Sequence, residues 1–186
     1  MHTLNCLFPQ SGLSKPLRGL YLACKLHQEA VDGDVLMYSN YIASLDGRIA
    51  LHDSHSHEFA VPKSIANDRD WRLYQELAAQ SDIMLTSARY FRQLAKGCAQ
   101  DLLPVGKGKP HDDLHAWRKN QKLSPQPDVM IVSSSLDIPL ESLAYVADRK
   151  IWVITTSHAN KERKRALEAV GAHILIGGKT AVQGDL

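Results

Sequence analysis

Apolar runs alternate with amphipathic segments in the C-terminal part of the chain, and this alternation most constrains the fold. The runs at 128–135, 150–156 and 172–178 have the length and composition of buried strands. The segments between them, 139–146 and 160–171, have helical periodicity. Strands joined by helices form parallel sheets, because each connection must return to the end of the sheet where it began. The sequence therefore predicts an α/β fold with a mostly parallel central sheet and helices on its faces.

Earlier segments extend the same pattern. Residues 35–44 are apolar and aromatic with few charges, which predicts a central strand that ends at the Asp-Gly turn of residues 44–47. A helix is predicted over 67–79, a short buried strand over 82–86, and a second helix over 87–97.

Helical periodicity also predicts which side of the 67–79 helix is buried. Trp71 should face the core, whereas Arg72 and Glu76 should face solvent. The following stretch, 98–127, is polar and interrupted by glycine and proline, which predicts a long loop that is either functional or mobile.

Size and composition limit the class of protein. The 186 residues suffice for an N-terminal arm over 1–34, with a short helix opened by Ser14 and Pro16, followed by one domain over 35–186. A net charge of +2 with mixed signs does not indicate a broad nucleic-acid-binding face, and no apolar run is long enough to span a membrane. Three scattered cysteines predict reduced thiols in a cytoplasmic protein.

Two motifs have alternative interpretations. His52, His55 and His57 could offer imidazoles to zinc, but their spacing and the lack of nearby cysteines favour a solvated loop without metal. The "GGKT" at 177–180 resembles half of a P-loop, but His173 stands where the full motif needs a glycine. The segment is therefore either a plain turn or a turn whose amides can bind an anion.

Small and hydroxylated residues follow the predicted strands. The carboxyl ends of parallel strands meet at one edge of a sheet, where ligands of such folds bind. Backbone amides and hydroxyl groups suit phosphates and ribose. The residues concerned at these ends are Thr86, Ser87, Ser133, Ser135, Gly177 and Gly178.

Several of these stretches together resemble a known family. "NYIASLDGRIA" (40–50), "DIMLTSARYF" (82–91) and "DVMIVSSSLDIP" (128–139) occur in the order found in the reductase domain of riboflavin biosynthesis. That domain is the C-terminal half of a bifunctional deaminase-reductase and also exists as stand-alone pyrimidine reductase-like proteins. The resemblance implies a three-layer dihydrofolate reductase-like fold. Because family members continue well past the last motif, it also implies a domain that is C-terminally truncated and incomplete at its C-terminus.

The resemblance further implies an NADPH-dependent reductase that acts on a small-molecule substrate, an aminouracil ribosylamine phosphate, as a homodimer. Asp46 and Asn40 would be catalytic, and Ser56 would contact substrate. A substrate-phosphate arginine of the family aligns with Ala78. The resemblance assigns to NADPH the following residues: Ile42, Ala43, Ser44, Phe59, Thr86, Ser87, Ser133, Ser135, Gly177 and Gly178. The alternatives are a non-catalytic nucleotide-binding remnant of the same fold and, ranked lower, a zinc-dependent hydrolase that uses the histidines.

Overall fold

The computed structural model describes residues 3–8, 11–30, 33–52, 59–62, 64–99, 103 and 105–183. The chain forms two compact units. Unit 1 comprises Met1–Ser81 with Pro104–Leu123, and unit 2 comprises Asp82–Leu103 with Ser124–Leu186. Among the described residues, no helix has the length and apolar character that crossing a membrane requires. The predicted domain boundary at residue 34 remains a prediction.

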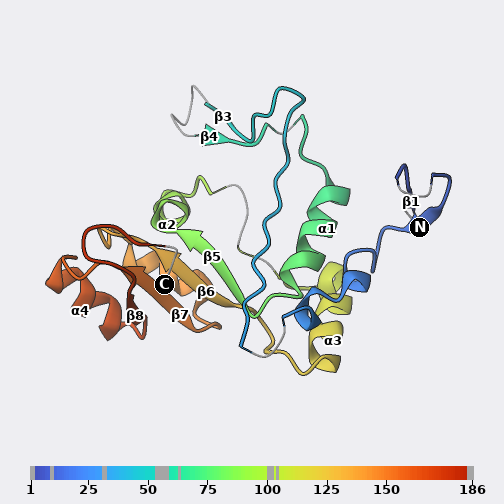
Figure 1. The fold of residues 1–186 in the computed structure, drawn as a ribbon. Helices are drawn as coiled ribbons and strands as arrows, with labels where there is room; N and C mark the ends of the chain where they lie inside the picture. The colour runs from blue at the N-terminus through green and yellow to red at the C-terminus, as the bar shows by residue number, and fades with distance from the viewer. Residues whose placement is uncertain are drawn as a thin grey trace. The chain divides into compact units, whose positions relative to one another are not determined.

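Unit 2 is built on a parallel sheet of four strands in the order β5-β6-β7-β8 (Figure 1). The strands are β5 (Ile83–Ser87), β6 (Asp128–Val132), β7 (Ile151–Thr155) and β8 (His173–Ile176). Each lies within a few residues of its predicted range. Neighbours in sequence are also neighbours in the sheet, and this arrangement confirms the predicted α/β class with a parallel sheet and flanking helices.

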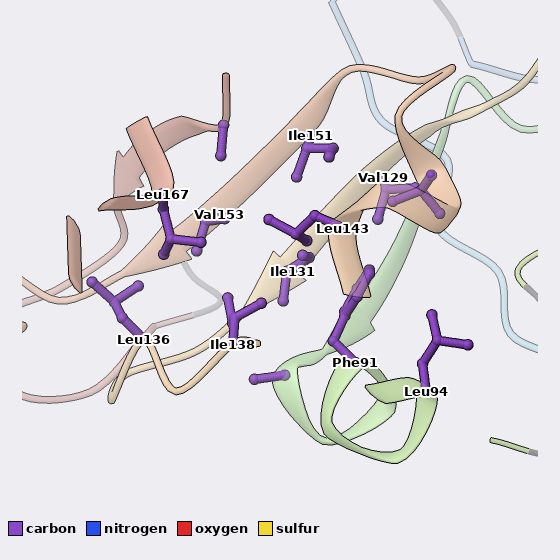
Figure 2. Close-up of a cluster of buried hydrophobic side chains, with 13 residues drawn as sticks. Phe91, Leu94, Val129, Ile131, Leu136, Ile138, Leu143, Ile151, Val153 and Leu167 are labelled. Atoms are coloured by element: carbon purple, nitrogen blue, oxygen red, sulfur yellow. The ribbon is translucent and has the colours of Figure 1, made fainter. Parts of the chain in front are cut away.

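One face of this sheet forms the core of unit 2. Val129 and Ile131 of β6 and Val153 of β7 are fully buried, whereas their neighbours in the strand are partly exposed, as the two-residue period of a strand requires. They join apolar side chains of α2 (Ala88–Ala95), the 3-10 helix η4 (Leu140–Val146) and α4 (Lys161–Ala169) (Figure 2). This core fixes the strand ends where the candidate site lies.

Unit 1 contains short elements around two helices. Its elements are β1 (Thr3–Asn5), β2 (Ser14–Pro16), η1 (Leu22–Cys24), η2 (Leu26–Gln28), β3 (Leu51–His52), β4 (Phe59–Ala60), α1 (Asp68–Ala78), η3 (Lys109–His111) and α3 (Asp112–Asn120).

Three predictions for unit 1 are wrong. Ser14 and Pro16 do not open a helix, because their segment pairs with β1 as an antiparallel hairpin. Residues 35–44 run without sheet hydrogen bonds, with Val35 88% and Met37 78% exposed, so they are not the predicted central strand. An apolar pattern favours an extended chain, but a strand also needs a hydrogen-bonded partner. The predicted loop over 98–127 contains α3.

The buried face of α1 includes two charged side chains that were predicted to face solvent. Glu76 is completely buried and Arg72 is 8% exposed. The Glu76 carboxylate accepts hydrogen bonds from the backbone amides of Gly19 (2.6 Å) and Tyr21 (2.9 Å) and from Arg72 Nε (3.1 Å). A charge can be buried when it is paired and hydrogen-bonded in this way. These contacts attach the N-terminal arm to α1, and Gln80 adds a bond from its side chain to Tyr21 O at 2.9 Å.

Candidate functional site

Residues 44–48 of unit 1 form a tight turn. Gly47 has a positive φ of 81°, which glycine adopts without steric cost, and its amide donates to Ser44 O at 2.9 Å. The Ser44 hydroxyl donates to one oxygen of the Asp46 carboxylate, and Arg48 Nε lies 3.1 Å from the other. Both carboxylate oxygens therefore have partners within the turn. The turn does not end a strand, contrary to prediction, and the catalytic role of Asp46 stays a prediction.

The other predicted residues of this segment lie just before the turn. Asn40 and Ala43 are exposed, and Ile42 is half-buried. None of the three belongs to a sheet. Their predicted contacts with a cofactor or substrate remain predictions.

The histidine stretch is described only at its ends. Ser56, His55 and His57 lie outside the described residues. His52 in β3 pairs with Phe59 in β4, and their rings meet edge to face with centroids 5.5 Å apart. Within the described parts of the chain, no group of three histidine, cysteine or acidic side chains is arranged to hold a metal ion.

The structure brings the predicted rim residues of β5 and β6 together in unit 2. The parallel register sets Ser87 opposite Val132, the residue before Ser133. Ser133 is 6% exposed, and its Oγ accepts a hydrogen bond from the Leu136 amide at 3.0 Å. Ser135 Oγ accepts from the Asp137 amide at 3.3 Å. The serine oxygens thus hold the turn after β6, and each hydroxyl keeps its hydrogen available for donation.

Two arginines surround this turn. Arg92 of α2 donates from Nη1 to Asp137 O at 2.9 Å, and Arg163 of α4 donates from Nη1 to Ser135 O at 3.1 Å. Their guanidinium groups lie 3.6 Å and 3.9 Å from the Asp137 carboxylate. Because these side chains are largely exposed, the ion pairs contribute little to stability. They make the rim beside β6 positively charged.

The second part of the rim is a loop after β8, residues 177–183. Gly177 and Gly178 begin it, and Gly177 N donates to Thr155 O of β7 at 2.8 Å. A cavity of about 680 Å³ is lined by Ser157, Ile176 and residues of this loop. Thr155 Oγ1, buried at the end of β7, has no hydrogen-bond partner within the described chain. Thr155 is fully buried and is not one of the residues that line this cavity.

The sequence assignment missed Lys179 and Thr180, which line this cavity. The signal for them was the "GGKT" segment, for which an anion-binding turn was one of two interpretations. Gly177 and Gly178 had been assigned for their small size. Lys179 and Thr180, which follow the two glycines, carry the positive charge and the hydroxyl group of this loop.

A third polar cluster lies in unit 1, around α1 and α3. Arg72 forms two bonds with the Asp113 carboxylate, at 3.0 Å and 2.5 Å. Burial alone would lower the pKa of Arg72, but its bonds with Asp113 and Glu76 raise it above the ordinary value. Burial would raise the pKa of Asp113, but the Arg72 bond lowers it below its usual range. Burial, and then the Arg72 charge, lower the pKa of His111. These groups keep fixed charge states near neutral pH and stabilise unit 1.

Comparisons with known proteins give a family and a fold. The sequence profile described as the RibD C-terminal domain matches residues 36–183. The crystal structure of a pyrimidine reductase-like protein from Corynebacterium diphtheriae is similar, with 19% identity, a TM-score of 0.52, and coverage of 76% of this chain and 54% of that one. The chain thus spans about half the length of that protein. The similarity confirms the predicted dihydrofolate reductase-like fold. No curated protein sequence matches.

Proposed function

This chain belongs to the RibD C-terminal domain family, a family of riboflavin-pathway-type reductases, and we propose that it is an NADPH-dependent reductase. In the proposed reaction, hydride from NADPH would add to C1 of the open-chain imine of a ribosylamine attached to a pyrimidine-type substrate, the imine nitrogen would take up a proton, and NADP⁺ would be left as the oxidised product. The ring-opened sugar becomes a ribityl chain. A homodimer in the cytoplasm is part of the same proposal.

The observation that carries the proposal is the polar rim of the parallel sheet in unit 2. Strand β5 ends on Thr86 and Ser87. Ser133 directly follows β6, its neighbour in the sheet, and Gly177 directly follows β8, which is separated from β6 by β7. Beyond parallel strand ends, small and hydroxylated residues let a ligand approach the backbone closely. A dinucleotide presents phosphates and ribose hydroxyl groups, which bind to hydroxyl and amide donors of this kind.

The described residues fit such a cofactor. The cavity after β8 has a volume of about 680 Å³, within the range of small-molecule sites. Ser133, Ser135 and the loop at 177–183 would hold the phosphate and ribose groups. When bound, NADPH supplies the hydride. The protein binds the two reactants, orients them and excludes water, so its contribution is mainly positioning and electrostatics.

Asn40 and Asp46 are retained as the proposed catalytic residues of unit 1, and Ser44 as a proposed cofactor-binding residue. Asp46 has a carboxylate that could act on a proton of the substrate, but in the turn it already interacts with Ser44 and Arg48. Ala78 is 4% exposed, so the position aligned with the family's substrate-phosphate arginine offers no cation. A substrate of this chain therefore either lacks that phosphate or has it bound by other residues.

Titration with NADPH, followed by cofactor fluorescence, tests the proposal. We expect saturable binding, and oxidation of NADPH when a ribosylaminouracil is added with or without its phosphate. Binding without oxidation would favour the non-catalytic alternative. An absence of binding would refute the proposed function.

A matched pair of variants tests Asp46. Asp46→Asn and Arg48→Gln each remove the same ion pair, which spans 3.1 Å between exposed side chains. If the carboxylate acts on the substrate, Asp46→Asn should lower kcat by about 100-fold or more with unchanged NADPH affinity. Arg48→Gln should leave kcat within about twofold, because an exposed ion pair contributes little. Equal losses in both variants would mean that only the turn matters.

A further inference from the structure

The loop at residues 177–183 is closed on itself by backbone hydrogen bonds. Gly177 N donates to Thr155 O (2.8 Å), Ser157 N donates to Gly178 O (2.9 Å), and Gln183 N donates to Gly177 O (2.7 Å). These bonds join the loop to the end of β7 and connect its two ends. The loop therefore has a defined shape before any ligand arrives, which lowers the entropic cost of binding.

Gly178 allows the loop to fold back this tightly. Its φ is +151°, and a Cβ at this position would lie 2.0 Å from Ala181 O. Any other residue would push the Ala181 carbonyl away and open the loop. The glycine is thus required by the close approach of the backbone to itself.

Consecutive donors in this loop are not used by the fold. Within the described residues, the backbone amides of Gly178, Lys179 and Thr180 donate no hydrogen bond, and the Lys179 ammonium forms no ion pair. Successive free amides form a concave surface that binds anions. The cavity of about 680 Å³ supplies the space, and among the described residues its lining has one cation and no carboxylate.

From these observations we infer that the loop at 177–183 binds a phosphate group, with Lys179 as the charged ligand and the amides of residues 178–180 as hydrogen-bond donors. The assignment rests on the proposed function, in which the phosphate belongs to the bound dinucleotide. Two parts of NADPH have this chemistry: the pyrophosphate that it shares with NADH, and the 2′-phosphate that NADH lacks. Lys179 is a binding residue in this assignment and takes no part in hydride transfer.

Lys179→Ala tests the assignment by direct binding of NADPH and NADH, measured by fluorescence titration. Because a charge-assisted bond to phosphate is removed, we expect the Kd for NADPH to rise about tenfold. Lys179→Arg should restore most of the affinity. The dependence of Kd on salt should also weaken in Lys179→Ala, because one ion pair with the ligand is gone. A purely structural role would not change the salt dependence.

Lys150→Ala is the matched control. Lys150 is exposed like Lys179 but precedes β7, at the amino end of the strands, so the substitution changes the net charge equally away from the loop. It should leave the Kd within about twofold. Since both lysines are exposed, neither variant should alter the circular dichroism spectrum or the midpoint of urea unfolding.

The two cofactors identify the phosphate. Equal weakening for NADPH and NADH assigns the pyrophosphate, and weakening for NADPH alone assigns the 2′-phosphate; both outcomes support the inference. If the wild type binds NADPH and Lys179→Ala binds it equally well, the inference is overturned and the proposed function stands. If the wild type does not bind NADPH, the proposed function fails. Calorimetry with inorganic pyrophosphate then decides: Lys179-dependent binding keeps the phosphate site, and no binding overturns it.

Discussion

Replacing Glu76 with alanine should detach the N-terminal arm from α1. The Glu76 carboxylate is completely buried and accepts hydrogen bonds from three backbone amides, those of Gly19, Tyr21 and Leu22, at 2.6, 2.9 and 3.4 Å. It also accepts one from Arg72 Nε at 3.1 Å. Alanine would remove all four acceptor contacts at once.

The size of the destabilisation caused by Glu76→Ala follows from the hydrogen bonds that each partner of the carboxylate loses. Removing one partner of a buried ion pair costs about 3–5 kcal/mol. Here the lower end applies, because Arg72 keeps its two bonds to Asp113. The arm amides are only partly buried, so water can replace some of their lost bonds, each worth roughly 1 kcal/mol. We therefore expect Glu76→Ala to lower the free energy of unfolding of unit 1 by about 3 kcal/mol.

Hydrogen exchange measured by mass spectrometry can locate the effect. Some amides of the arm exchange only when the arm detaches from α1. For these amides, in peptides covering residues 17–28, a loss of about 3 kcal/mol in the free energy of detachment should accelerate exchange roughly 100-fold. Glu76→Gln keeps one acceptor oxygen and should have a smaller effect. The control is Glu168→Ala, which removes an exposed carboxylate 3.9 Å from Lys164 and should change stability by less than about 1 kcal/mol. An unchanged exchange rate in the arm of Glu76→Ala would contradict the assignment of this carboxylate as the anchor.

Two further predictions concern stability. Burial and the Arg72 charge hold the pKa of His111 below the ordinary value of 6.5, so on acidification the unfolded state binds this proton first. The contribution of neutral His111 to the free energy of unfolding is thus complete above about pH 6.5 and falls as the pH decreases. Urea titrations at several pH values measure this dependence, and we expect it to be weaker in His111→Gln. The same dependence of the free energy of unfolding on pH in His111→Gln and in the wild type would contradict this role of His111. Phe91 is completely buried against the sheet, so Phe91→Ala should destabilise unit 2 by about 3–5 kcal/mol in urea unfolding, and a loss below about 1 kcal/mol would show that the site is not packed as described.

The fold of unit 2 was predictable because its signals are local. The buried runs that became β6 and β7 are bounded by turn residues, and α4 begins at the capping residue Asn160, whose side chain accepts from the amides of residues 162 and 163. Gly171, with a φ of +89°, follows the end of that helix. Each signal acts within a few residues and needs no knowledge of distant partners.

Unit 1 was less predictable because its stabilising contacts are distant in sequence. Glu76 is buried by amides more than fifty residues away, and no periodicity rule assigns a carboxylate to the inside of a helix. Residues 35–44 have the composition of a strand, but the partner that defines a strand cannot be read from the segment itself. Helix α3 did have a local signal, with Asp112 and Asp113 in its first turn and Arg118 and Lys119 in its last.

For the candidate site, the sequence located the rim but not which of its groups remain free to bind. The oxygens of Ser133 and Ser135 already accept backbone hydrogen bonds, so these serines offer a ligand chiefly their hydroxyl hydrogens. The Asp137 carboxylate lies beside two guanidinium groups, and the free groups of the loop at 177–183 include successive backbone amides and the Lys179 ammonium. The remaining capacity of this rim is therefore mostly to donate. Phosphate oxygens only accept, whereas a nicotinamide carboxamide needs donors and acceptors together. This edge of unit 2 is accordingly better suited to the phosphate-bearing part of a dinucleotide than to its redox ring.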